Sequence, residues 1–355
     1  MSAARRRGAR MLPTALRTAA GRAPVLGAVV LGALVLGSST VGASAARASS
    51  TNVDGLWYFT ETGMAEQHEI STGEGVTIGL IDSAINPDAP DLRGTDLEVH
   101  EPSYCGTEPE GPAAPAASTE ETAGHASGMA AMILGTGAGL DGTPGTLGVA
   151  PDARVIAYAA LTGPDGKPSV SCPPIADEDG QGWLTGPIDQ AIADGVDIIN
   201  ISLASEGTDD GDAIARALRA GIVVVGASLS DGGPVAGFPA AVNGAVGVES
   251  MGPDLERADH AVSALGLVHA PGEEIHQIDD DFSGYSPRSG SSNAAAYTTS
   301  ALALLMSRYP EATGNQAIQS LLRNTGGEEH EPGASGEWGY GAVNVRSMLE
   351  HDTEQ

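Results

Sequence analysis

Three residues whose types together perform nucleophilic catalysis stand at the ends of apolar segments. Asp82 closes the run VTIGLID, His125 opens the small-residue segment HASGMAAMILG, and Ser292 precedes the Ala/Leu-rich segment NAAAYTTSALALLM. A serine hydroxyl becomes a nucleophile when a base removes its proton and an acid orients that base and stabilises the imidazolium. The three residues supply one of each group and are therefore the candidate catalytic residues.

Each of these residues also has a purely structural interpretation. Asp82 would cap a strand end, His125 would be a packed or capping residue, and Ser292 would be a helix N-cap, a position that serine favours. The neighbouring Ser289 and Ser291 are open to the same interpretation. Because the sequence alone does not bring the three side chains together, the elements that carry them decide the question.

Apolar runs of strand length alternate with helical patterns along the chain. The predicted strands lie at residues 75–82, 153–161, 195–203, 221–228 and 244–250. The predicted helices between them lie at residues 125–135, 186–195 and 212–221. This alternation predicts an α/β fold with a mostly parallel sheet and helices on both faces. In such sheets functional groups gather at the carboxyl ends of the strands, where Asp82 stands.

Residues 1–48 have the layout of a secretory signal peptide. A basic segment without acidic residues precedes the apolar run APVLGAVVLGALVLG, and small residues offer cleavage after Ala45 or Ala48. The alternative is a membrane anchor, which is disfavoured because glycines interrupt the apolar run directly before those cleavage sites. We therefore expect a secreted, extracellular protein with no membrane span in the mature chain. Three adjacent arginines in the leader also fit twin-arginine export.

The mature chain is strongly acidic. The full chain has 17 basic residues against 46 acidic ones, and loss of the seven arginines in the leader brings the charge to about −36. Few basic groups remain to neutralise phosphates, so nucleic acid is excluded as a partner. The charge indicates a solubility adaptation or an attraction for cationic substrates.

The only two cysteines, Cys105 and Cys172, lie in loop-like contexts of the exported part. Such a pair in an exported protein favours a disulfide. The sequence contains neither a Cys/His cluster with zinc spacing nor an HExxH motif. A catalytic metal is therefore not indicated, and we expect no cofactor.

The contexts of the three candidate residues resemble those of a known family. The segments DSA, HAS and GSSNA are similar in kind and order to the Asp-Ser/Thr-Gly, His-Gly-Thr and Gly-Thr-Ser-x-Ala motifs of the subtilisin-like serine peptidases, or subtilases (peptidase family S8). LGVAPDARVIAYAAL and AIADGVDIINISLAS also resemble strands of that family, and the resemblance covers roughly residues 55–348. It implies a three-layer subtilisin-like fold in which Asp82, His125 and Ser292 form the catalytic triad.

The resemblance also implies the substrate and where it binds. Ser202, Leu203 and Ala204 would line the cleft, with the backbone of a protein or peptide substrate pairing alongside them as a strand. We expect the enzyme to act as a monomer.

Several positions depart from the family motifs close to the chemistry. Ala84 replaces the glycine after the Asp-Ser pair, Ala126 and Ser127 replace the Gly-Thr after the histidine, and Ala296 replaces a helix proline. Ala84 matters if its position needs positive φ, which only glycine adopts without cost. The other replacements are mild in size.

The most serious departure lies in the oxyanion hole. Where the family carries asparagine, the segment VVVGASLSDGG places Ser230, or Asp231 if the loop is one residue longer. A serine hydroxyl can donate to an oxyanion, whereas an ionised aspartate cannot and repels the developing charge. Loss of the side-chain donor costs about 10²–10³ in rate in the subtilisin example on which this magnitude rests.

Two further family features are reduced. The loop at residues 140–151 resembles a calcium loop, but Gly142 occupies a side-chain ligand position, so we expect a weak calcium site or none. Because the N-terminal extension is short, we expect no folded inhibitory propeptide, a layout similar to that of the actinobacterial mycosins, and we expect no C-terminal anchor of the kind that mycosins usually carry. The expected organisation is a signal peptide (1–48), an N-terminal extension (49–72), a peptidase domain (73–350) and a tail (351–355).

The sequence thus predicts a secreted subtilisin-like serine endopeptidase that acts through an acyl-enzyme. The alternative is a catalytically weak or inactive subtilase-fold binding protein, which the altered oxyanion segment motivates. A hydrolase of another fold is disfavoured because GSSNA lacks the Gly-x-Ser-x-Gly elbow.

Overall fold

The structure is a computed structural model. The structure describes residues 53–106, 112–161, 183–205, 210–229, 237–258 and 267–351. By internal contacts the chain divides into residues 1–50 and 51–355, and all described residues belong to the second unit. The predicted signal peptide, Cys172, Ser230 and Asp231 lie outside the described residues.

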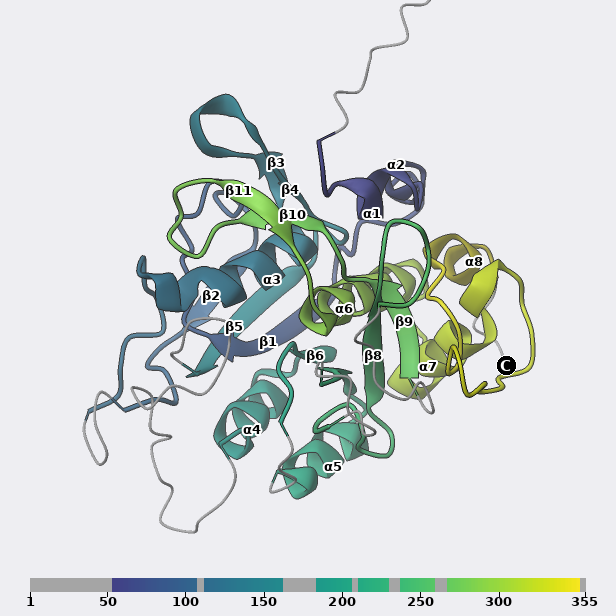
Figure 1. The fold of residues 1–355 in the computed structure, drawn as a ribbon. Helices are drawn as coiled ribbons and strands as arrows, with labels where there is room; N and C mark the ends of the chain where they lie inside the picture. The colour runs from purple at the N-terminus through teal and green to yellow at the C-terminus, as the bar shows by residue number, and fades with distance from the viewer. Residues whose placement is uncertain are drawn as a thin grey trace, which may run out of the picture. The chain divides into compact units, whose positions relative to one another are not determined.

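A seven-stranded sheet forms the centre of the molecule (Figure 1). Its strands, in spatial order, are β2 (Leu97–His100), β5 (Arg154–Leu161), β1 (Thr77–Ser83), β6 (Ile198–Ile201), β7 (Val223–Ala227), β8 (Val246–Met251) and β9 (Leu267–Pro271). Every neighbouring pair is parallel, which confirms the predicted parallel sheet.

The five predicted apolar runs all become strands of this sheet. Their β-branched side chains are buried on both faces, as expected of a parallel sheet covered by helices. The edge strands β2 and β9 were not predicted. The four residues of β2 are mixed in polarity and none is fully buried, so they carry no strong pattern.

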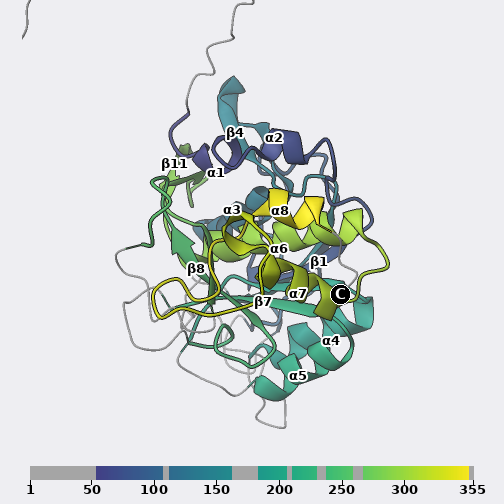
Figure 2. The same cartoon turned by 90° about the vertical axis from the view of Figure 1, so that its right-hand side faces the viewer.

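Helices cover both faces of the sheet, as Figures 1 and 2 show. On one face α3 (Gly124–Leu134) and α6 (Ser291–Arg308) pack against each other and against the strands. On the other face lie α4 (Thr185–Asp194) and α5 (Gly211–Arg219). The result is the predicted three-layer arrangement. Alanines and serines fill much of α6, and small side chains let this helix lie buried along most of its length.

The remaining elements lie around this framework. The short helices are α1 (Trp57–Thr60), α2 (Met64–Gln67), α7 (Gly314–Arg323) and α8 (Val345–Glu350). Two hairpins pair β3 (Thr136–Ala138) with β4 (Pro144–Leu147) and β10 (Ile275–Ile278) with β11 (Tyr285–Arg288). Single 3₁₀ turns lie at Glu121–Ala123, Leu140–Gly142 and Thr325–Gly327. Within the described ranges no helix is long and apolar enough to cross a membrane.

Candidate active site

Asp82 lies at the carboxyl end of the central strand β1, where the apolar run forces it into the interior. Its side chain is only 1% exposed. Oδ1 accepts from the backbone N–H of Ser83 at 2.6 Å and lies 2.7 Å from Nδ1 of His125. A carboxylate that accepts a ring N–H at this distance orients the imidazole and stabilises its protonated form.

His125 is the second residue of α3, and the end of β1 is tied directly to the start of this helix. The hydroxyl of Ser83 donates to the carbonyl of Ala84 at 2.9 Å and accepts from the N–H of Ala126 at 3.2 Å. Ser127, one of the departures from the family motif, donates to the Ala123 carbonyl at 2.7 Å. These local contacts hold the histidine helix beside the strand that carries Asp82.

The backbone conformation at Ala84 does not require a glycine. Ala84 is not among the non-glycine residues with positive φ, and its side chain is buried. Alanine therefore occupies this position without the strain that a left-handed conformation would impose. The replacement does not disturb the strand end that presents the carboxylate.

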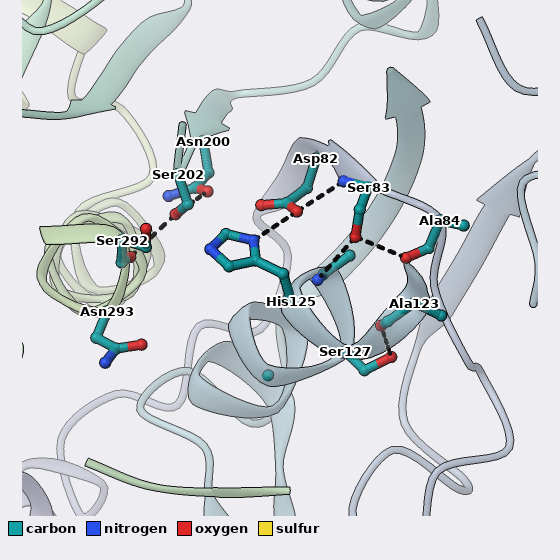
Figure 3. A network of polar contacts seen from close by, with 12 residues as sticks. Asp82, Ser83, Ala84, Ala123, His125, Ser127, Asn200, Ser202, Ser292 and Asn293 are labelled. Atoms are coloured by element: carbon teal, nitrogen blue, oxygen red, sulfur yellow. Dashed lines mark hydrogen bonds and ion pairs between the residues drawn. The ribbon is translucent and has the colours of Figure 1, made fainter. Parts of the chain in front are cut away.

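Ser292 is the second residue of α6, on the opposite side of the imidazole from Asp82 (Figure 3). The ring nitrogen that does not contact Asp82 is directed toward the side where the serine lies. The N-cap of α6 is Gly290, with no side-chain capping bond, so none of the serines serves as its N-cap. The structure thus joins Asp82 to His125 by a hydrogen bond, and the role of Ser292 as their nucleophile stays a prediction.

The two neighbouring serines have structural partners. Ser291 donates to the Ser228 carbonyl at 2.6 Å, and the hydroxyl of Ser289 accepts from the N–H of Glu274 at 3.0 Å. Both therefore fix the approach to α6. Of the three serines, Ser292 is the one whose hydroxyl has no such structural contact among the described residues.

The predicted cleft residues follow β6, and the first of them, Ser202, contacts the backbone of Ser292. The hydroxyl of Ser202 lies 3.0 Å from the Ser292 carbonyl and 2.8 Å from Oδ1 of Asn200. Asn200 in turn donates to the hydroxyl of Thr299 on α6 at 2.9 Å. Leu203 is buried, whereas Ala204 is partly exposed.

The roles of Asn200 and Thr299 were missed by sequence reasoning. An amide inside the apolar run DIINISL was the available signal, because a buried polar side chain needs a hydrogen-bond partner. Their bond locks β6 to α6 directly behind the site.

The predicted oxyanion residues Ser230 and Asp231 lie outside the described residues, which end before them at Leu229. Asn293, next to the nucleophile, has a different task. It donates to the carbonyls of Gly272 and Arg288 at 3.0 and 3.2 Å and accepts from Gln277 at 2.9 Å. These bonds hold its amide away from an oxyanion role and fix the start of α6.

Of the two cysteines, Cys105 lies among the residues that the structure describes. Cys105 is fully buried next to β5, where the N–H of the preceding Tyr104 donates to the Ala159 carbonyl at 2.8 Å. Cys172 lies outside the described residues, and the disulfide stays a prediction.

The candidate calcium loop forms the tip of the β3–β4 hairpin. Gly142 has φ of 82° and supplies no ligand, and the Pro144 carbonyl lies 3.2 Å from Nε2 of His276. Asp91 is buried nearby, where Oδ2 accepts from the N–H of Thr146 at 3.2 Å and Oδ1 has no partner in the described part. Calcium takes six to eight oxygen ligands. A calcium site at this loop, weak or absent, stays a prediction.

Burial affects the chemistry of Asp91. Its pKa is raised from the ordinary value chiefly because burial disfavours the charged form. No group of three His, Cys, Asp or Glu side chains suited to a metal occurs among the residues that the structure describes.

Comparison with known proteins identifies the family to which this arrangement corresponds. The model of the subtilase family matches residues 73–341. A thermostable alkaline protease of Halalkalibacterium halodurans is 30% identical over 260 residues, which cover 70% of this chain and 62% of that protein. Subtilisin DY of Bacillus licheniformis is 28% identical over 287 residues, covering 78% of this chain and 92% of that protein.

Solved structures share the fold. The prenylagaramide maturation protease PagA superposes with a TM-score of 0.63 at 20% identity, covering 81% of this chain and 98% of that one. A mutant of the protease domain of PatA also gives a TM-score of 0.63 at 20% identity, with 79% and 96% coverage. At this identity the likeness concerns the fold.

Proposed function

Because this chain belongs to the subtilase family of serine endopeptidases, we propose that it hydrolyses peptide bonds through an acyl-enzyme formed on Ser292. The observation that carries the proposal is the bond between His125 and Asp82 at 2.7 Å, with Ser292 on the other side of the imidazole (Figure 3). A base that is oriented by a buried acid and faces a hydroxyl is the arrangement that activates a serine.

Each residue has one role in the proposed reaction. His125 takes the proton of Ser292 as its oxygen attacks the peptide carbonyl, and then gives that proton to the leaving amine. A water molecule, activated by the same imidazole, releases the acyl group. Asp82 keeps the proton of the neutral ring on Nδ1, so that the other nitrogen accepts from the serine.

The start of α6 supports the same role for Ser292. The first backbone N–H groups of a helix lack partners within the helix and carry partial positive charge. Ser292 is the second residue of this 18-residue helix, so its own N–H is a backbone donor for the oxyanion. Ser230 would add a hydroxyl donor in place of the asparagine of the family.

The cleft and the leader complete the proposal. Ser202, Leu203 and Ala204 would pair with an extended protein or peptide substrate. Residues 1–48 would direct secretion and be removed, since their basic, apolar and small-residue segments follow the order of a signal peptide.

Labelling with a fluorophosphonate tests the proposal. The mature protein should react at Ser292, identified by peptide mass spectrometry, and should slowly cleave an unfolded protein substrate. Ser292→Ala should abolish both reactions. Ser289→Ala, which removes the serine hydroxyl three positions earlier, is the matched control and should retain them.

The alternative is an inactive subtilase fold that binds other proteins. The reason to consider it is that the oxyanion asparagine of the family is replaced in this chain. Loss of that side-chain donor lowers the catalytic rate by about 10²–10³-fold. If the wild type and Ser292→Ala are equally unreactive toward probe and substrate after correct processing, the enzyme proposal fails and the binding role takes its place.

A further inference from the structure

A fully buried carboxylate lies close to the active site and has no role in the reaction described above. Glu249, on β8, is 0% exposed. Oε2 accepts from the hydroxyl of Ser228 at 2.8 Å, and Oε1 accepts from the N–H of Ser250 at 2.8 Å. Burying a carboxylate is costly unless its oxygens are paired, and each of its two oxygens accepts one of these bonds.

Ser228 connects Glu249 to the first turn of α6, the helix that carries Ser292. This residue follows β7, and its N–H donates to the Val248 carbonyl at 3.0 Å. Its own carbonyl accepts from the hydroxyl of Ser291 at 2.6 Å. Ser291 is the first residue of α6 and directly precedes Ser292. Ser228 is therefore held at its amide, its hydroxyl and its carbonyl.

These bonds form one path from the sheet to the nucleophile. The carboxylate of Glu249 fixes the Ser228 hydroxyl, and the Ser228 carbonyl fixes the Ser291 hydroxyl. Ser228 also precedes the segment in which the sequence places the oxyanion donor, Ser230. Ser228 thus links the end of β7 to the start of α6 through hydrogen bonds.

A neutral side chain would fit the strand at lower cost. The residues of β8 are all buried, and Val246 and Val248 belong to the hydrophobic core. A hydrogen bond from a hydroxyl to an ionised acceptor is stronger than one between neutral groups, and a low-dielectric interior strengthens it further. A carboxylate at this position therefore fixes the Ser228 hydroxyl more firmly than a neutral acceptor would.

We propose that Glu249 is a positioning residue for the peptidase reaction, which acts through Ser228 and Ser291 to hold the nucleophile in place. The inference rests on the proposed function. Its consequence is that loss of the acceptor lowers kcat and leaves KM nearly unchanged, because the cleft residues after β6 stay in place.

Kinetics of four variants test this role, with each rate divided by the concentration of fluorophosphonate-titrated sites. Glu249→Leu removes the acceptor, and displacement of reacting groups by about 1 Å costs about 10²-fold in rate, so we expect a fall in kcat of that order. Glu249→Gln keeps a weaker, neutral acceptor oxygen and should lower kcat less than Glu249→Leu does, by about 3- to 10-fold. Ser228→Ala removes only the hydroxyl and should lower kcat about 10-fold.

The control matched to Glu249→Leu is Asp210→Leu, which also removes a buried carboxylate acceptor. Asp210 is also buried and accepts from a hydroxyl, that of Thr185 at 2.8 Å, but this pair lies at the ends of α4 and α5. This variant should lower the melting temperature without changing kcat per titrated site.

Three outcomes would overturn the inference. They are an unchanged kcat per titrated site in Glu249→Leu, a rise in KM alone, or a fall in Glu249→Gln as large as that in Glu249→Leu. If Glu249→Leu does not fold, an unchanged kcat in Ser228→Ala has the same meaning. A wild type that never reacts with the probe refutes the proposed function and this inference together, whereas an active wild type with indifferent variants refutes only the inference.

Discussion

Nδ1 of His125 lies 2.7 Å from Oδ1 of Asp82, and the carboxylate is buried at the end of the central strand. This contact joins the acid and the base of the proposed triad. The strand end and the helix start are locked together by Ser83, so the distance depends on packed elements and not on a mobile loop.

The first prediction concerns the acid of this pair. Asp82→Asn should lower kcat/KM by roughly 10⁴-fold, because an amide favours the wrong imidazole tautomer and cannot stabilise the imidazolium. Initial rates on an unfolded protein substrate and the rate of fluorophosphonate labelling measure the effect. Circular dichroism should show an intact fold. A loss below about 10-fold would exclude Asp82 from the triad.

The second prediction concerns the oxyanion segment. Ser230→Asn should raise kcat about 10- to 10²-fold, because the longer amide reaches farther toward the oxyanion than a hydroxyl does. Asp231→Asn is the matched control and should change kcat less than about 3-fold. If Asp231→Asn gives the acceleration instead, the loop is one residue longer and Asp231 occupies the oxyanion position.

The third prediction concerns the two cysteines. A disulfide between Cys105 and Cys172 closes a loop of about 67 residues and should stabilise the fold by roughly 4 kcal/mol through chain entropy. Intact mass after alkylation should show no labelled thiol until the unfolded protein is reduced. Two thiols that are labelled without reductant under denaturing conditions contradict the pairing.

The fourth prediction concerns acid stability and a buried histidine. His269 on β9 is 0% exposed, and neither ring nitrogen has a hydrogen-bond partner among the described residues. Burial, with a smaller contribution from the charge of Arg257, lowers the pKa of His269 to about 4. Because an unfolded histidine has a pKa of about 6.5, the folded state binds fewer protons between these values.

The sign follows from this difference. The contribution of His269 to stability is fully present above pH 6.5 and is lost as the pH falls toward 4, by up to about 3 kcal/mol. Urea unfolding at several pH values should show a smaller acid loss in His269→Leu than in the wild type. Parallel pH dependence of the two proteins would show that the histidine does not contribute.

The fifth prediction concerns calcium. Since Gly142 occupies a side-chain ligand position in the loop at residues 140–151, we expect melting temperatures in millimolar calcium and in chelator to agree within about 1 °C. Magnesium at the same concentration controls for ionic strength. A calcium-specific rise of several degrees would mean that Asp91 or Asp141 supplies the missing ligand.

The sequence by itself determined the parallel sheet and the candidate triad. Runs such as VTIGLID and GIVVVGAS are continuous and β-branched, so their local pattern predicts buried strands, and the order of chemistry-bearing residues along them is read directly from the chain. The short strand β2 was not predicted, because its four residues are mixed in polarity and show no hydrophobic periodicity. Its backbone is extended because it pairs with β5 in the sheet.

Only the tertiary structure decided which polar side chains meet. Asn200 and Thr299 are 99 residues apart, and Ser228 and Ser291 are 63 apart, yet each pair is joined by a buried hydrogen bond. Such contacts depend on which strands become neighbours and on where a helix crosses them, and no local periodicity records that. The position of Glu249 beneath the active site is of the same kind. In the sequence Glu249 is only one acidic residue in an apolar strand. Its proposed role follows from Ser228, the hydrogen-bond partner that the fold places beside it.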